Sequence, residues 1–208
     1  MDPLAQLLAD GLEGLGLSAT DAQQARLLEF PRLLRKWNRV YNLTAIEDPA
    51  RMVRLHLLDS LSLLPYLKGR RVLDVGTGAG LPGIPLALLA PDKAFTLLDS
   101  NAKKTRFVRQ AAIELGLANV QVEHARIEQY RPAQGFDTVL VRAFAGLPVI
   151  VGETARLLNP GGTILAQKGK LPQEEITALD NVIVEAFPLA VPGIDAERHL
   201  VAIQLRGQ

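Results

Sequence analysis

The first third of the chain carries hydrophobic residues at helical spacing. Leucines recur every three or four positions from Leu4 to Leu15, and a second stripe runs from Leu27 through Trp37 to Tyr41. We therefore expect residues 1–68 to form an N-terminal helical extension.

Three local signals divide this helical region. Ser18 with Asp21 is a plausible N-cap signature for the second helix, and the dipeptide Asp48-Pro49 is a good start for a third. Pro31 lies inside the second stripe and predicts a kink or a restart there, because proline removes a backbone donor.

From residue 70 onward, short apolar runs alternate with helical segments. The expected strands are 71–75, 95–99, 120–123, 138–142, 163–168, 182–187 and 199–205, and the expected helices are 81–90, 102–116, 147–158 and 172–180. This alternation predicts an α/β fold with a doubly wound, seven-stranded sheet over residues 69–208. Only a loop joins the last two strands, so they should pair antiparallel at one edge.

The strongest chemical signal is the glycine-rich turn of residues 76–83, between the first strand and its helix. A dinucleotide fingerprint needs glycine at the first, third and sixth places, and Leu81 takes the sixth. The pattern is instead an acid, Asp74, followed by Gly76, Gly78 and Gly80, which is typical of the first motif of S-adenosylmethionine (SAM) methyltransferases. We expect these glycines to bind the cofactor. The alternative is a tight strand–helix turn.

Asp99 ends the second expected strand, 23 residues after Gly76. A carboxylate at a strand tip suits the two hydroxyls of a ribose. The alternative is an N-cap of the next helix, which Ser100 or Asp99 would serve. After the third strand, Ile127 and Glu128 lie where this fold usually contacts adenine. The alternative for each residue taken alone is that Ile127 belongs to the core and Glu128 is solvated.

Composition narrows the chemistry. The 208 residues are 48% hydrophobic, and the net charge is +1, so no global field attracts nucleic acid. The absence of cysteine excludes disulfides, thiolate metal sites and the nucleophile that C5 methylation of a pyrimidine needs. The three scattered histidines make a metal centre an unpromising reading.

Neither a signal peptide nor a membrane helix is expected. The start lacks a basic region before an apolar core, and glycines and prolines break the longest uncharged stretch, residues 75–91. We expect a soluble, cytoplasmic protein that is monomeric, since no coiled coil is evident.

Basic residues gather in local clusters. One lies between residues 30 and 56, a second near residues 103–109, and Lys168 with Lys170 ends the fifth strand. Together they could track a phosphate backbone, and the alternative is a set of solvated helix faces.

Arg142 ends the apolar fourth strand, where an unpaired cation is costly. It must meet a carboxylate, a phosphate or a base edge. A structural salt bridge, for example to Glu128, is the alternative. Phe144 could stack on a base or belong to the core. Exocyclic-amine methylation typically uses an Asp/Asn-Pro-Pro-aromatic segment here, and this chain lacks it.

Several segments taken together resemble the bacterial 16S rRNA small subunit methyltransferase G family, also called glucose-inhibited division protein B. They are Lys36-Trp37-Asn38, Tyr41-Asn42-Leu43-Thr44, His56-Leu57-Leu58-Asp59-Ser60-Leu61, residues 74–85, Leu98-Asp99-Ser100 with Lys103-Lys104, Arg142-Ala143-Phe144 and Lys168-Gly169.

The resemblance implies a Rossmann-like class I fold and methyl transfer from SAM to N7 of guanine 527 in 16S ribosomal RNA, as free RNA or in the 30S subunit. It implies that Gly76, Leu81, Ile127, Glu128 and Arg142 contact SAM, with Arg142 also a catalytic candidate at the substrate. For RNA contact we expect Arg39, Arg54, Lys103, Lys168 and Arg198. His56 and His199 read as structural.

Three other functions remain open at this point. They are a methyltransferase for a small molecule or protein, a non-enzymatic SAM-binding RNA module, and a dehydrogenase.

Overall fold

The computed structural model describes residues 2–142 and 145–207. The N-terminal region is helical, as predicted. Its elements are α1 (Pro3–Gly14), α2 (Asp21–Tyr41), α3 (Pro49–Met52), a π-helical segment (Val53–Leu58), α4 (Asp59–Leu61) and a 3-10 turn (Leu64–Tyr66).

For α2, the expected N-cap is wrong, and of the two expectations for Pro31 the restart is excluded. The N-cap is Thr20 rather than Ser18, and Thr20 forms a reciprocal pair with Gln23: the Thr20 hydroxyl accepts the Gln23 N–H at 3.2 Å, and the Gln23 side chain accepts the Thr20 N–H at 2.9 Å. The helix also does not restart at Pro31, which lies buried inside it. Packing of the flanking turns outweighs the one hydrogen bond that proline removes. The predicted start at Asp48-Pro49 is confirmed, with Asp48 accepting the Arg51 N–H at 2.7 Å.

The second region alternates strands and helices as predicted. The strands are β1 (Arg71–Val75), β2 (Ala94–Asp99), β3 (Val120–His124), β4 (Phe136–Arg142), β5 (Leu158–Lys168), β6 (Val182–Pro188) and β7 (His199–Leu205). The helices are α5 (Gly83–Leu89), α6 (Ala102–Glu114), α7 (Leu147–Thr154) and α8 (Gln173–Thr177), with 3-10 turns at Ile127–Gln129 and Ala155–Leu157.

The strands form one seven-stranded sheet in the order β3-β2-β1-β4-β5-β7-β6. The first five are parallel, and β7 lies between β5 and β6, antiparallel to both. The predicted antiparallel pairing of the last two strands is therefore confirmed.

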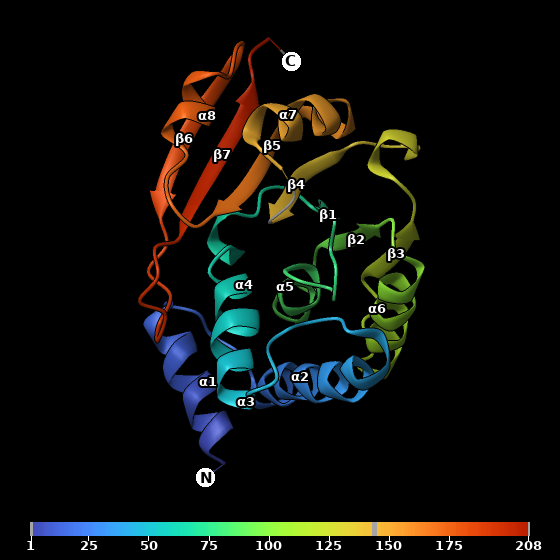
Figure 1. The fold of residues 1–208 in the computed structure, drawn as a ribbon, viewed down its shortest axis with the longest axis vertical. Helices are drawn as coiled ribbons and strands as arrows, with labels where there is room; N and C mark the ends of the chain where they lie inside the picture. Colours follow the sequence, from blue (N-terminus) through green and yellow to red (C-terminus); the bar gives the residue numbers. More distant parts are fainter. Residues whose placement is uncertain (1, 143–144, 208) are drawn as a thin grey trace.

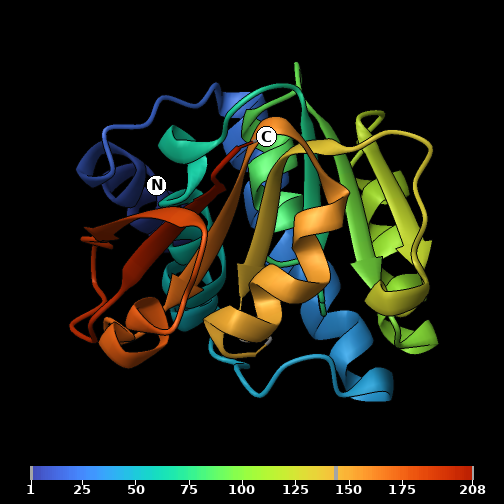
Figure 2. The ribbon, with the colours of Figure 1, turned by 90° about the horizontal axis from the view of Figure 1, so that it is seen from above.

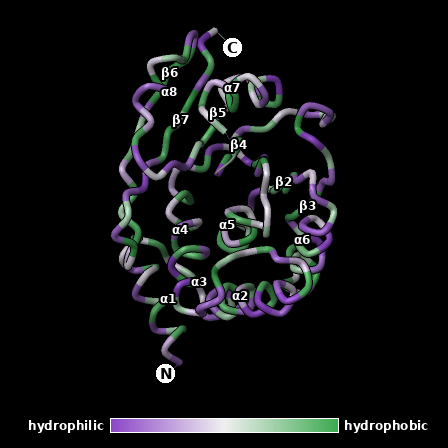
Figure 3. Tube along the Cα trace, viewed as in Figure 1, coloured by the Kyte–Doolittle hydropathy of each residue, from purple (hydrophilic) through white to green (hydrophobic). Residues whose placement is uncertain are grey.

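Helices cover both faces of the sheet. On one face, α1, α2, the π-helical segment, α5 and α6 share a single hydrophobic cluster with sheet residues such as Val72, Phe95 and Leu140. Figure 1 shows the hydrophobic α5 lying between α2 and the strands, and Figure 3 shows α2 alternating between hydrophobic and hydrophilic residues. On the other face, α7 packs on the alternate residues of the same strands.

The order in which strands are added to the sheet reverses between β1 and β4, which are themselves parallel neighbours. From β1 the sheet grows through β2 to β3 on one side, and from β4 to β5 on the other. The connections on the two sides of this point diverge, which leaves a crevice at the carboxyl ends of the strands, the usual ligand position in such sheets. In Figure 2, β2 and β4 point to the lower edge, and the light-blue segment after α2 runs along it.

Within residues 2–142 and 145–207, none of the helices has both the length and the apolar character needed to cross a membrane.

The shared hydrophobic cluster predicts that the N-terminal helices and the sheet unfold together. Leu34 is fully buried on α2, whereas Val40 on the same helix is 73% exposed. We expect Leu34→Ala to lower the free energy of unfolding by about 2–5 kcal/mol and Val40→Ala to change it by less than about 0.5 kcal/mol. Urea titrations followed by Trp37 fluorescence, which reports on α2, and by far-ultraviolet circular dichroism should give coincident transitions. An early, separate fluorescence transition would contradict a shared core.

Candidate functional site

The turn after β1 is held by a fully buried carboxylate. Asp74 accepts the hydroxyl of Thr77 at 2.6 Å and the backbone N–H of Gly83 at 2.9 Å. Its two partners lie at opposite ends of the turn, so Asp74 fixes the path between β1 and α5. Burial raises the pKa of Asp74 to about 6, and the hydrogen bonds from Thr77 and Gly83 oppose that rise.

Glycine is required in this turn for conformation and for space. Gly76, Gly78 and Gly80 have φ of +67°, +59° and +82°, a region that side chains disfavour. A Cβ on Gly83 would lie 2.1 Å from a methyl of Leu97, so α5 could not pack this closely on β2 with a larger residue.

A first cavity of about 360 Å³ opens beside this turn, at the ends of β1, β2 and β3. It brings together four of the predicted cofactor residues, Gly76, Asp99, Ile127 and Glu128. The other four, Gly78, Gly80, Leu81 and Arg142, do not line it. Gly80 and Leu81 are buried behind the turn, where Gly80 packs against Ile84. The remaining lining residues are Val75, Leu98, Ser100, Lys104, Ala125 and Arg126.

Sequence reasoning missed Lys104 and Arg126 as lining residues. Lys104 was visible only as one member of a basic cluster, and its position on the first turn of α6, directly after β2, is the signal that could have placed it.

Asp99 connects the turn to the next helix. Its Oδ2 accepts the Gly78 N–H at 2.8 Å and its Oδ1 accepts the Asn101 N–H at 2.8 Å. The N-cap of α6 is Asn101, which accepts the N–H groups of Lys103 and Lys104, so the alternative of an N-cap at Ser100 or Asp99 is wrong. Asn101 follows Ser100, and its side chain reaches the N–H groups of Lys103 and Lys104 at the start of α6.

The acceptors and apolar side chains that line the first cavity fit SAM. A carboxylate oxygen has two lone pairs, so each oxygen of Asp99 can accept a ribose hydroxyl beside its backbone N–H. Ile127, Leu98 and Ala125 offer an apolar surface for the adenine ring of SAM. The glycine-rich turn would present backbone rather than side chains to the remainder of SAM.

A second cavity of about 480 Å³ lies across the crevice, at the ends of β4, β5 and β7. Arg142 lines it, and Arg142 Nη1 lies 3.4 Å from Asp59 Oδ2. The alternative pairing with Glu128 is therefore wrong, because the nearest carboxylate comes from the N-terminal helices. The other lining residues are Ile46, Leu55, His56, Asp59, Gln167, Lys168, Gly169 and Arg198.

Two predicted RNA-contact residues line this second cavity, and each already has a carboxylate partner. Lys168 Nζ donates to Glu175 Oε2 at 3.0 Å and to the carbonyl of Ala145 at 2.9 Å. Arg198 Nε donates to Asp59 Oδ1 at 3.0 Å. Elsewhere, Lys103 is exposed at the start of α6, and Arg54 packs against Gly193 in the loop before β7.

His56 is buried on the wall of the second cavity. Its Nε2 lies 3.0 Å from the hydroxyl of Thr44, whose N–H donates to Asn38 Oδ1 at 2.9 Å. This chain of contacts ties α2, the following loop and the π-helical segment together. Burial, and after it the charge of Arg142, lower the pKa of His56 to about 4. His56 is therefore neutral at pH 7.

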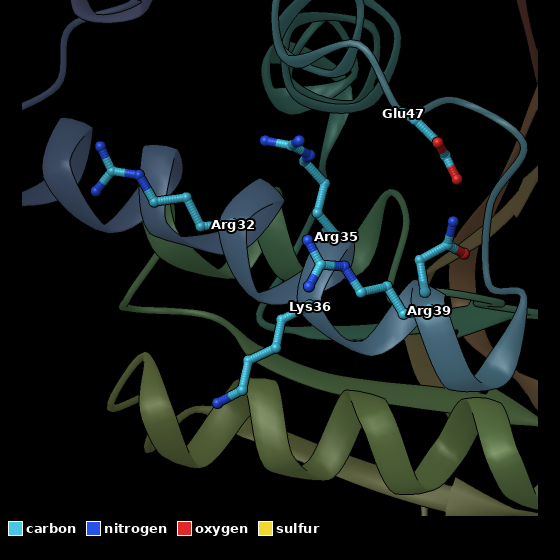
Figure 4. A pocket seen from close by; sticks show the side chains of 6 residues that line it. Arg32, Arg35, Lys36, Arg39 and Glu47 are labelled. Atoms are coloured by element: carbon cyan, nitrogen blue, oxygen red, sulfur yellow. The ribbon is translucent and has the colours of Figure 1, made fainter.

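The basic cluster on α2 forms a groove beside the loop that follows the helix. Arg32, Arg35, Lys36 and Arg39 line this groove with Asn38, and Glu47 of the loop lies across it (Figure 4). Glu47 thus faces the groove, whereas its neighbour Ile46 lines the second cavity. Arg32 lies 3.3 Å from Glu29 and 3.9 Å from Asp2. Phe144, for which stacking on a base and a place in the core were the alternatives, lies outside the described residues.

Comparison with known proteins gives a consistent family. The model of the family described as rRNA small subunit methyltransferase G matches residues 23–201. A protein of Methylococcus capsulatus named ribosomal RNA small subunit methyltransferase G is 59% identical over 97% of this chain and 99% of its own length. One of the same name from Alkalilimnicola ehrlichii is 52% identical over 96% of this chain and 92% of its own.

Solved structures of lower identity support the fold alone. The O-methyltransferase TomG from Streptomyces achromogenes has a TM-score of 0.59 at 17% identity, covering all of both chains. A putative O-methyltransferase from Klebsiella pneumoniae has a TM-score of 0.61 at 16% identity, covering 97% of this chain and 98% of its own. The class I methyltransferase fold expected from the sequence is confirmed.

The lowered pKa of His56 predicts a pH dependence of stability. A histidine whose folded pKa is depressed stabilises the fold fully above its unfolded pKa of 6.5, and this contribution is lost as the pH falls toward about 4. The His56→Gln variant lacks this pH-dependent contribution to stability. The raised pKa of Asp74 changes stability with pH in the opposite direction, but it does so in both proteins. We expect the stability difference between wild type and variant to shrink by about 2 kcal/mol from pH 7.5 to pH 5. Urea titrations at the two pH values measure it, and a constant difference would contradict the burial of a neutral imidazole.

Proposed function

The chain belongs to the rRNA small subunit methyltransferase G family, and on this premise we propose that it transfers the methyl group of SAM to N7 of guanine 527 in 16S ribosomal RNA. The observation that carries the proposal is the pair of cavities that flank the β1–β4 reversal point. One offers carboxylates and apolar side chains, and the other offers basic side chains. A ribosomal RNA substrate would place the enzyme in the cytoplasm, and we propose that it acts as a monomer.

We propose that the first cavity holds SAM. Asp99 would accept the ribose hydroxyls, Ile127 would pack against the adenine, and Glu128 would accept a hydrogen bond at the adenine edge. The turn through Gly76, Gly78, Gly80 and Leu81 would surround the methionine portion, with Leu81 acting from behind the turn.

The target atom suits a site that removes no proton. When bound, SAM supplies an electrophilic methyl group, and the sulfur–carbon bond breaks as the bond to N7 forms. Guanine N7 has an in-plane lone pair and no hydrogen, so the chain needs no general base, which fits the neutral, buried His56. Holding N7 in line with the methyl group can then supply most of the rate.

Arg142 is the side chain best placed to orient the two substrates. It ends β4, beside the turn that follows β1, and its charge lowers the pKa of Asp74 near the end of β1 as well as that of His56 in the second cavity. A guanidinium on the reacting lone pair would block attack. Arg142 would therefore contact guanine O6, a phosphate or the SAM carboxylate.

We propose that the α2 groove binds the RNA backbone. Arg35, Lys36 and Arg39 are exposed on consecutive turns of the helix, and the loop beside them borders the second cavity. Lys103, Arg54, Lys168 and Arg198 would add contacts nearer to the base. A guanine presented in a loop could enter the second cavity once unstacked.

The direct test incubates the protein with methyl-labelled SAM and 16S RNA, free or in 30S subunits, from cells that lack the gene. We expect label in 7-methylguanosine at position 527. Label on another nucleoside would overturn the assignment of the target atom. Transfer to protein or small molecules alone would favour the rival methyltransferase, and SAM binding with no transfer would favour the non-enzymatic module.

Arg142→Ala separates the two roles of this arginine. If Arg142 orients the guanine, the variant keeps its SAM affinity and loses RNA methylation by about 100-fold. If it binds the SAM carboxylate, affinity for SAM falls instead. Isothermal titration with SAM and single-turnover methylation measure the two effects, and wild-type behaviour in both would remove Arg142 from the site.

Replacing the α2 cations tests the RNA-binding groove. We expect Arg35→Gln, Lys36→Gln and Arg39→Gln, combined, to weaken 16S RNA binding and to reduce the slope of log affinity against log salt by about 1 for each phosphate that the variant no longer neutralises. Arg70→Gln is the control, since this exposed arginine precedes β1 at the opposite edge of the sheet. An unchanged slope in the triple variant, or an equal loss in the control, would contradict the proposal.

A further inference from the structure

We infer that Asp59 is a positioning residue for methyl transfer, whose buried carboxylate holds the guanidinium groups of Arg142 and Arg198 on one wall of the second cavity. This inference rests on the proposed function and assigns to Asp59 a role that it performs through the two arginines it contacts.

Asp59 is the meeting point of four segments that are distant in the sequence. Its Oδ2 lies 3.4 Å from Nη1 of Arg142 at the end of β4, and its Oδ1 accepts Nε of Arg198 before β7 at 3.0 Å. Gln167, near the end of β5, donates its Nε2 to Oδ1 and to the backbone carbonyl of Asp59, both at 3.1 Å. Asp59 itself begins α4 in the N-terminal helices.

The burial of the three charges points to positioning. The side chain of Asp59 is 7% exposed, whereas those of Arg142 and Arg198 are 24% and 23% exposed. The carboxylate thus contributes little exposed surface to the cavity wall, and the two cations contribute more. Burial raises the pKa of Asp59, and the charges of Arg142 and Arg198 oppose that rise. Two guanidinium groups so close would repel each other without an anion between them.

Asp59 leaves most of the hydrogen-bonding capacity of Arg142 for a ligand. A guanidinium has five N–H donors, and within the described residues only Nη1 of Arg142 has a partner. Arg198 donates from Nε to Asp59 and from Nη1 to the carbonyl of Glu197. The carboxylate therefore fixes each guanidinium by one edge and turns the rest toward the cavity, where guanine O6 or a phosphate would accept.

The backbone around Asp59 is held independently of the ion pairs. Ser60 Oγ donates to the His56 carbonyl at 2.5 Å, and Ser62 Oγ donates to the Asp59 carbonyl at 2.7 Å. This segment continues from the π-helical turn, a feature that often marks functional sites. Replacing only the charge of Asp59 should therefore change the guanidinium positions more than the fold.

The test compares Asp59→Asn in the wild-type and Arg142→Ala backgrounds by single-turnover methylation of 16S RNA at saturating SAM. We expect Asp59→Asn to lower the methylation rate by about 10- to 100-fold, with changes of less than about threefold in SAM and RNA affinity. In the Arg142→Ala background, the same substitution should lower the rate by less than about threefold, because residues that act through one another are not additive.

Asp137→Asn is the matched control. Asp137 is likewise a carboxylate with several donors, two backbone N–H groups and the amide of Asn159, but it lies at the start of β4, at the opposite end of the strand from Arg142. We expect it to lower stability and leave the rate unchanged. If Asp59→Asn does not fold, Asp59→Glu, which keeps the charge and displaces the guanidiniums, carries the same comparison.

Two results would overturn the inference. One is an unchanged rate in folded Asp59→Asn, and the other is an equal fold-loss in both backgrounds. Failure of the proposed function is distinguishable, because the wild-type protein would then not methylate 16S RNA at all.

Discussion

The functional site depends on how the turn after β1 is fixed in place. Two carboxylates take its backbone donors: Asp74 from inside the sheet, through Gly83, and Asp99 from the neighbouring strand, through Gly78. These oxygens satisfy backbone N–H groups of the turn. Its glycines can adopt the left-handed backbone conformation, and they place no side chains in the space beside the turn. The first cavity exists as a consequence of that arrangement.

The second cavity depends on the N-terminal helices as much as on the sheet. Its wall combines Arg142 and Gln167 from strand ends with His56 and Asp59 from the helical region. Those helices share a hydrophobic cluster with one face of the sheet, so their packing sets the position of the polar groups. The helical extension is thereby part of the site that we propose for the acceptor base.

The sequence was informative where the signal is local. Alternating strands and helices predicted the sheet, and the glycine spacing with Asp99 predicted the first cavity. Long-range pairing was inaccessible: Arg142 clearly needed an anion, yet nothing in the spacing indicates that Asp59, 83 residues earlier, supplies it. The N-cap at Thr20 was missed although its signal is local, because Gln23 stands three residues after Thr20 and completes a capping box that Ser18 lacks.

The most direct measurement of the central claim is a crystal structure with S-adenosylhomocysteine, the product that remains after methyl transfer. The account predicts ribose hydroxyls on Asp99, adenine against Ile127, and the sulfur facing the crevice toward Arg142. A ligand bound elsewhere, or a first cavity that stays closed at saturating ligand, would contradict it.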